Sequence, residues 1–540
     1  MSHFFSSRLR RFGRLAFCAC AGLTLLVSIA VPAPAQASAE TLATAGRGRI
    51  LLVLPFDNKT GQPSLEWIRE AAPSILSSRF TSAGFAPMSR TDRLYALDHL
   101  GLPQGFQPSR ASSLKLAQTL DADSIVVGNY VTDGTGILAE ARIVDVPHMR
   151  MSEPVTARGE MRDLIAVFDS LAWKLTRQLD PGFSGSQETF LAAGANLRID
   201  AFEQYIRGIS ESDQPERLRH LQQAVKMSPD FGAAWMALGR EDYNGQQYEQ
   251  AAAAFAKVGS EGADALEAGF YRGLSLMFSG DYAHAEAAFS GVARVLPLAE
   301  VLNNQGVAIS RQGHDGSAMF RQAATADPNL ADYHFNLAVS LKRHGDTAGA
   351  MTELSQCLKL RTNDSEAQEL LSAWKQPAAA SNLDPLERIV RTFDASAFRQ
   401  AAVMMDQMEA TRLAALSPQQ RAQTLTTQAR DFLSRGLLLE SERLYQAAVV
   451  ADNRAEDAHA GLAEVRERTG DADGARKEAR AALELKPSAS AYLVLARLDF
   501  AASHLSDANH EAGEALKLNP NSLAAQELLR QVAAKEQQPR

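Results

Sequence analysis

The sequence predicts an α/β domain, with a mixed sheet and helices, followed by an all-α superhelical solenoid. Two observations carry this prediction. Aliphatic runs typical of buried strands alternate with helical patterns in residues 45–182. After them, one arrangement of small residues, a glycine, an aromatic and a proline recurs about every 33 residues, from Phe231 to Pro520. A repeat of that length is typical of units that bury their apolar faces only by stacking.

The chain begins with a segment typical of export. Four arginines, from Arg8 to Arg14, precede the apolar stretch 15–31, and small residues with A-x-A spacing follow as far as Ala39. These are the three parts of a cleavable secretory signal peptide. We expect residues 1–39 to be removed and the mature protein to be periplasmic or secreted. The alternative is an uncleaved segment that anchors the protein in the inner membrane.

Charge and cysteine content narrow the function classes. The formal net charge is −8, and removal of the four arginines would take it to about −12. This balance argues against nucleic-acid binding, which requires a basic face. Cys18 and Cys20 lie inside the signal segment, so the mature chain keeps Cys357 alone and forms no intramolecular disulfide. Its stability must therefore come from packing.

The α/β domain is expected in residues 45–182. Ile50–Leu54 is an aliphatic run that predicts a buried strand, and Ser124–Tyr130 predicts a second one. Asp133-Gly134 is a hairpin signal, after which alternation predicts a further strand. An amphipathic helix is predicted from Met161 to Leu179. Strands that alternate with helices and then pair in a hairpin indicate a mixed sheet.

Three segments of this domain resemble TolB amino-terminal-like domains. Residues 53–61 (V-L-P-F-D-N-K-T-G) are similar to the opening of that family, and residues 120–128 and 141–145 are similar to two of its later strands. Those bacterial domains are often found beside helical repeats. The resemblance implies an envelope or regulatory protein that acts by assembly or binding rather than by catalysis.

One loop of the domain is a candidate ligand site. Asn58–Gly61 follows a buried strand, which is where α/β domains commonly place ligands. A small-molecule sensor or enzyme subunit with its ligand at this loop is our alternative for the function. A tight turn that caps the following helix explains the same residues without a ligand.

The repeat is best seen at Trp235, Leu238 and Gly239, followed by Ala251 and Phe255. The pattern W-x2-L-G then A-x3-F resembles the tetratricopeptide repeat, a helix–turn–helix of 34 residues. Small residues at these positions let the two antiparallel helices approach closely, and the aromatic is expected to fill the space between adjacent repeats. The resemblance implies a scaffold that binds proteins in a concave groove.

We expect about eight repeats, in two groups. The first array is predicted in residues 196–375 and begins with a degenerate half-copy from Phe202 to Pro229. Residues 376–384 read as a linker because they contain proline and small residues. The second array, with a C-terminal capping helix, is predicted in residues 385–535. Its first part, 386–416, has the apolar spacing of two helices, so whether the array is continuous there stays open.

The first helix of each repeat lines the concave face, which defines a candidate partner-binding groove. Asn304 and Asn336 each stand just before the helix position at which small residues recur, and in some members of the family an asparagine there holds a peptide main chain. For every groove residue, packing against a neighbouring helix is the alternative. The candidate groove residues are Met236, Arg240, Tyr243, Phe270, Leu274, Met277, Asn303, Val307, Phe335, Asn336, Val339 and Lys342.

No pattern in the sequence indicates chemistry. The histidines do not cluster at metal-ligand spacing, and there is no C-x-x-C, H-E-x-x-H or G-x-S-x-G. We therefore predict no catalytic residues, no metal and no cofactor. The function expected is an exported, non-catalytic scaffold or adaptor of the bacterial cell envelope that binds partner polypeptides. The partner, the pathway and the oligomeric state do not follow from the sequence.

Overall fold

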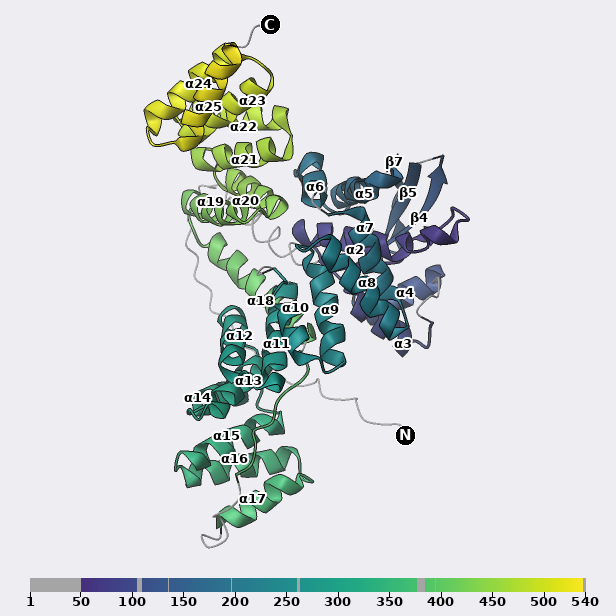
Figure 1. Cartoon of the computed structure of the whole chain (residues 1–540), viewed down its shortest axis with the longest axis vertical. Helices are drawn as coiled ribbons and strands as arrows, with labels where there is room; N and C mark the ends of the chain where they lie inside the picture. The colour runs from purple at the N-terminus through teal and green to yellow at the C-terminus, as the bar shows by residue number, and fades with distance from the viewer. Residues whose placement is uncertain are drawn as a thin grey trace, which may run out of the picture. The chain divides into compact units, whose positions relative to one another are not determined.

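The computed structural model describes residues 50–103, 109–134, 136–195, 197–259, 263–375, 384–393 and 395–537 (Figure 1). The chain divides into a unit of Met1–Ala45 and a unit of Gly46–Arg540, and all described residues lie in the second. The predicted signal peptide and most of the predicted linker fall outside the described residues.

A seven-stranded mixed sheet forms the first domain. Its strand order is β3-β1-β4-β5-β6, while β2 pairs with β4 and β7 pairs with β5. The strands β1, β2 and β3 run parallel to their neighbours, whereas β4 and β5 form the predicted antiparallel hairpin, which turns at Gly134 with φ +64. The strands are β1 (Ile50–Val53), β2 (Asp57–Asn58), β3 (Ala86–Pro87), β4 (Ser124–Asp133), β5 (Gly136–Asp145), β6 (Arg150–Met151) and β7 (Val155–Glu160).

Helices cover both faces of this sheet because its buried strands present aliphatic side chains on either side. Leu51 and Val53 face α2 (Ile68–Ser82) and α5 (Leu164–Leu179). The alternate residue Leu52 faces α3 (Arg90–His99) and α4 (Arg110–Thr119). The predicted α/β domain with a mixed sheet is therefore confirmed.

A short helix that we did not predict, α6 (Gln187–Gly194), follows this domain. Ser186 caps it by accepting a hydrogen bond from the Thr189 N–H at 3.1 Å. The Ser186 N–H in turn donates to the carboxylate of Glu442, 3.3 Å from either oxygen. The helix therefore links the first domain to the second helical array.

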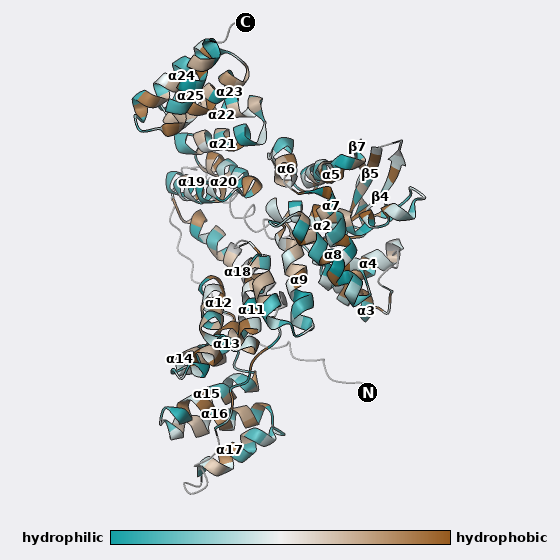
Figure 2. Ribbon diagram, viewed as in Figure 1, coloured by the Kyte–Doolittle hydropathy of each residue, from teal (hydrophilic) through white to brown (hydrophobic). Residues whose placement is uncertain are grey.

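Antiparallel helical hairpins make up the rest of the described chain. Hydrophobic and hydrophilic residues share the surfaces of these helices, as expected of amphipathic helices in a solenoid (Figure 2). Residues 199–227 form a complete hairpin, so the expectation of a half-copy there is wrong. The helices of the first array are α7 (Ile199–Ser210), α8 (Gln214–Met227), α9 (Gly232–Asn244), α10 (Tyr248–Phe255), α11 (Ala263–Ser279), α12 (Tyr282–Val295), α13 (Ala299–Arg311), α14 (Ser317–Ala326), α15 (Ala331–Arg343), α16 (Thr347–Leu360) and α17 (Ser365–Lys375).

Glycine in the first helix of a hairpin makes room for the aromatic of the second. A Cβ on Gly239 would lie 2.8 Å from the Phe255 ring, and one on Gly273 would lie 2.6 Å from the Phe289 ring. Gly306 stands in the same relation to Phe320. The glycine and the aromatic therefore recur together because each pair lets two helices approach closely.

The second array follows a single helix, α18 (Ala395–Ala414). Two helices were expected over residues 386–416, and that expectation is wrong, because the described residues before α18 form neither a helix nor a strand. No helix within the described ranges combines the length and the apolar character needed to cross a membrane. The helices of the second array are α19 (Pro418–Ser434), α20 (Leu438–Ala451), α21 (Glu456–Thr469), α22 (Ala472–Leu485), α23 (Ala489–Ala501), α24 (Leu505–Leu518) and α25 (Leu523–Glu536).

Candidate functional site

Residues 384–393, which we call the strap, lie across the first helices of three successive hairpins, α11, α13 and α15. Their sequence is D-P-L-E-R-I-V-R-T-F, and no helix or strand is assigned to them. Arg388 and Val390 both turn main-chain groups toward these helices. Because the two residues are two positions apart, this alternation is that of an extended chain.

Two asparagines hold the main chain of the strap. Asn304 donates from Nδ2 to the Val390 carbonyl at 2.7 Å and accepts from the Val390 N–H at 3.0 Å. Asn336 makes the same pair of bonds with Arg388, each at 2.7 Å. Asn303 adds a donor to the Arg388 carbonyl at 3.1 Å and accepts from Asn336 at 2.8 Å. All three asparagines are fully buried, so the strap satisfies amides that would otherwise lose hydrogen bonds.

A basic pocket receives the acidic side chain of the strap. The Glu387 side chain is 1% exposed, and its Oε1 accepts hydrogen bonds from Ser310 and Arg343. Its Oε2 lies 3.6 Å from Nε of Arg311 but accepts no hydrogen bond from any described residue. Arg343 reaches the strap a second time, through the Pro385 carbonyl at 2.6 Å. The pocket thus favours a carboxylate, although Oε2 of Glu387 has no hydrogen-bond donor among the described residues.

An acidic pocket beside it receives Arg388. The guanidinium bonds both carboxylate oxygens of Asp364, at 2.6 and 2.9 Å, and contacts Asp332 and Glu366 at 2.9 and 2.8 Å. It also stacks on the Phe335 ring, 3.6 Å from the ring centroid. Hydrogen bonding by Arg388 lowers the pKa of Asp364, so this carboxylate stays charged. Bidentate contact combined with stacking favours arginine over lysine at this position.

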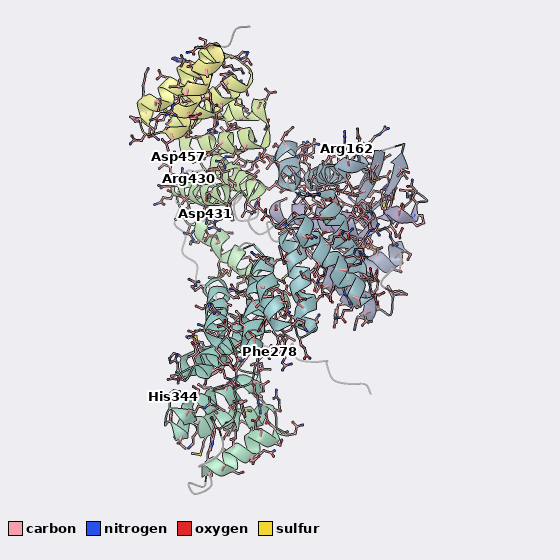
Figure 3. The ribbon with its side chains drawn as sticks, in the orientation of Figure 1. Arg162, Phe278, His344, Arg430, Asp431 and Asp457 are labelled. Carbon is pink, nitrogen blue, oxygen red and sulfur yellow. The ribbon has the colours of Figure 1, made fainter. Side chains whose placement is uncertain are left out.

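Apolar and aromatic contacts complete the strap. Ile389 and Phe393 pack against the cluster that contains Phe270, and the Phe270 and Phe393 rings are 5.4 Å apart. Val390 packs against a second cluster, between α13 and α15. The Arg391 guanidinium lies 4.8 Å from the ring of Phe278, which Figure 3 labels on α11. Leu386 is 60% exposed and contributes little to the contact.

The predicted groove residues fall into two sets. Asn303, Asn336, Phe335 and Phe270 contact the strap directly. The others have packing or pairing partners within the array, as the alternative that the sequence left open requires. Met236, Leu274, Met277, Val307 and Val339 are buried in clusters between helices, Tyr243 packs on Tyr271, Arg240 pairs with Glu267, and Lys342 donates to Thr347.

Sequence reasoning missed the charged side chains of the groove and its occupant. Arg343, Asp332 and Asp364 stand at the ends of helices or between them, where charge is normally solvent-exposed. One sequence feature could have indicated the occupant of the groove. Glu387 and Arg388 are followed directly by the apolar pair Ile389-Val390, and this segment does not follow the repeat pattern.

The loop Asn58–Gly61 is closed by its own side chains. The Asn58 Oδ1 accepts from both the N–H and the hydroxyl of Thr60, at 3.0 and 2.6 Å. Its Nδ2 donates to Glu66 at 2.9 Å, and the Thr60 hydroxyl accepts from the Gln62 N–H. Gly61 has φ +71, which the turn requires. This geometry is that of a capped turn. The side chains of Asn58 and Thr60 form their hydrogen bonds within the turn and with Glu66.

Side chains that could bind a metal or carry unusual protonation were compared across the described part of the chain. No group of three or more His, Cys, Asp or Glu side chains there is placed to hold a metal ion. Asp499 and Glu511 form a close carboxyl pair in the second array, with Arg476 bound to Asp499 at 2.6 Å. Burial and the neighbouring Asp499 raise the pKa of Glu511 to about 8. Cys357 is buried, and burial raises the pKa of its thiol to about 11, so it is unreactive near neutral pH.

Comparison with known proteins agrees with the helical architecture. Residues 426–490 match the family model described as tetratricopeptide repeat. Similar solved structures include MamA (13% identity, covering 30% of this chain and 96% of that one, TM-score 0.28) and YrrB, described as "a TPR protein with an unusual peptide-binding site" (14%, 37% and 97%, TM-score 0.28).

The LpoB C-terminal domain from Salmonella enterica is a further similar structure (14% identity, covering 21% of this chain and 84% of that one, TM-score 0.18). No match was found among curated proteins. All of these TM-scores lie below 0.5, so nothing about function rests on the structural likenesses. Residues 426–490 are thus similar to tetratricopeptide repeats, and the chain as a whole combines a mixed sheet with a helical solenoid.

Proposed function

We propose that the protein is an exported, non-catalytic scaffold of the bacterial cell envelope that binds a partner polypeptide in the groove of the first array. The observation that carries this proposal is the pair of two-way hydrogen bonds from Asn304 and Asn336 to Val390 and Arg388. Both asparagines bind the N–H and the C=O that every non-proline residue has. Such a groove therefore suits an extended peptide.

The place of action rests on the N-terminal sequence. The basic, apolar and small-residue regions of residues 1–39 support export, with a periplasmic or secreted mature protein, and membrane anchoring through an uncleaved segment as the alternative. The resemblance of residues 53–61 to TolB amino-terminal-like domains supports an envelope role for the first domain. Binding of a small molecule at Asn58–Gly61 has no support from the geometry, because the polar groups of that loop already bond one another.

Crosslinking in cell envelopes tests the proposal. The tagged protein would be crosslinked and its partners identified by mass spectrometry, beside the variant Asn304→Ala/Asn336→Ala. A matched control is Thr427→Ala, which changes an exposed side chain at the equivalent helix position of the second array. We expect a partner crosslinked to α13 or α15 that the groove variant loses and the control keeps. A partner kept by all three proteins would place binding elsewhere, and the absence of any partner would contradict the scaffold function.

A further inference from the structure

The groove already holds a peptide, and that peptide belongs to the same chain. The strap covers the asparagines, the basic pocket and the acidic pocket, so the first array offers no empty peptide site at these described residues. We propose that the strap is an exchangeable internal ligand that closes the groove until an extended peptide of the same chemistry displaces it. This inference rests on the proposed function and identifies the partner by its chemistry.

The contacts of the strap define that chemistry. One residue must supply a carboxylate for Ser310 and Arg343, and the next must supply a guanidinium for Asp364 and the Phe335 face. Two aliphatic residues follow, and an aromatic residue lies three positions further on, against Phe270. The partner is therefore a protein with an accessible extended segment of the pattern Glu-Arg-aliphatic-aliphatic-x-x-aromatic.

Three properties of the contact suit exchange better than permanent packing. Its central bonds join asparagine side chains to main-chain groups, which any extended peptide can replace. The Arg388–Asp332 pair is partly exposed, so water can solvate these two side chains when they separate. Glu387 leaves one buried carboxylate oxygen without a hydrogen bond from the described residues, so a better-fitting peptide has free energy to gain.

The strap also has a strong advantage over a free peptide. It is part of the same chain as the groove, between α17 and α18, so it competes at a high effective concentration, on the order of 1 mM. The wild-type groove is open for only a small fraction of the time, and the apparent affinity for a free peptide falls by that fraction. Weakening the strap should therefore raise the affinity for the peptide without any change to the groove.

A fluorescein-labelled peptide with the sequence of residues 384–393 tests this in the full chain, by fluorescence anisotropy. Glu387→Ala/Arg388→Ala weakens the strap through its side chains. Val390→Pro weakens it independently, because it removes the N–H that donates to Asn304. Circular dichroism and thermal unfolding show that each variant is folded, and either folded variant suffices for the test. The control peptide carries the charge exchange Glu387→Arg/Arg388→Glu.

We expect the opened variants to bind the peptide at least about tenfold more tightly than the wild type, and the control peptide to bind weakly. Adding Asn304→Ala/Asn336→Ala to an opened variant should abolish binding. Equal affinity of the wild type and the opened variants would show that the strap does not close the groove. Failure of the folded opened variants to bind would show that the strap is a fixed part of the array. Either result would overturn the inference and leave the scaffold function to stand or fall on envelope crosslinking.

Discussion

The two helical arrays share an architecture but differ in what their first helices present to a peptide. Both contain a histidine held in the same way. His334 contacts Glu353 at 2.7 Å and the Pro328 carbonyl at 3.1 Å. His459 contacts Glu478 at 2.7 Å and the Asn453 carbonyl at 3.2 Å. The sequence separations are identical, so the two hairpins align residue by residue along the chain.

This register aligns the peptide-binding position between the arrays. Asn336 lies two residues after His334, and the residue two after His459 is Gly461. Asn304 lies two residues before the small residue Gly306, and Thr427 and Val494 lie two residues before Ala429 and Ala496 in the second array, so these positions correspond. The first array therefore places two asparagines in succession at a position where the second has threonine, glycine and valine. The repeat thus builds the groove, whereas a few polar side chains decide whether it holds a main chain.

The first prediction, with an expected effect at least as large as that of the others, places an asparagine in the second array. A Cβ on Gly461 would lie 2.2 Å from the Tyr445 ring, so Gly461→Asn must push a buried aromatic aside. We expect a loss of about 1–3 kcal/mol in the free energy of unfolding, measured by urea denaturation. Gly513→Asn is the matched control, because a Cβ there meets nothing within 4 Å. Similar small effects at both positions would contradict the close packing of Gly461 on Tyr445.

The second prediction removes an asparagine from the first array. Asn336→Ala leaves the Arg388 N–H without its acceptor and removes one donor from the Arg388 carbonyl. We expect the free energy of unfolding to fall by about 1–3 kcal/mol, as measured by urea denaturation. Thr427→Ala, at an exposed site of the second array, should change the stability by less than about 0.5 kcal/mol. Equal losses of unfolding free energy for Asn336→Ala and Thr427→Ala would contradict the proposed difference between the arrays, in which only the first array holds a main chain at this position.

The third and smallest effect concerns charge. Arg388 of the strap binds Asp332 and Asp364 in the first array, while Glu511 of the second array lies beside Asp499, with Arg476, His504 and Asp507 nearby. The pKa of Glu511 is raised to about 8 by burial and by Asp499. A raised carboxyl pKa contributes stability below the unfolded value, near 4.5, and this contribution is lost as the pH rises through about 8.

Replacing Glu511 with glutamine should therefore reduce the loss of stability between pH 5 and pH 9, by roughly 1 kcal/mol. Thermal unfolding of the wild type and of Glu511→Gln across this range measures the effect. The same charged neighbours are present in both proteins, so only the difference between the two curves is diagnostic. Parallel curves would show that Glu511 titrates like an ordinary surface carboxyl group.

Most of the helical fold followed from local pattern. Gly239 with Phe255 and Gly273 with Phe289 recur at fixed spacing because each pair solves the same packing problem between two neighbouring helices. The strand that begins at Ile50 and the turn at Gly134 were likewise predictable, since burial and backbone conformation constrain them locally. Helix α6 was not predicted, because its eight residues are too few to show a periodicity.

The strap was misread for a physical reason. Leu386, Ile389, Val390 and Phe393 have the spacing of one face of a helix, so the sequence predicts a helix there. The asparagines of α13 and α15 instead satisfy the main chain in an extended form, and contacts outside the segment override its local preference. Asn303 and Arg388 are 85 residues apart, and no local pattern shows that they meet. The asparagines could therefore be predicted as binding residues, but their occupant could not.

Amide hydrogen exchange at Arg388 and Val390 tests the central claim most directly, because these two N–H groups donate to Asn336 and Asn304. It would be measured by NMR in the wild type and in Asn304→Ala/Asn336→Ala. We predict that both amides are protected in the wild type and lose their protection in the variant, while amides within α14 are unchanged. Exchange of both amides at the rate of an unstructured peptide in the wild type would contradict this prediction and show that the strap does not lie in the groove.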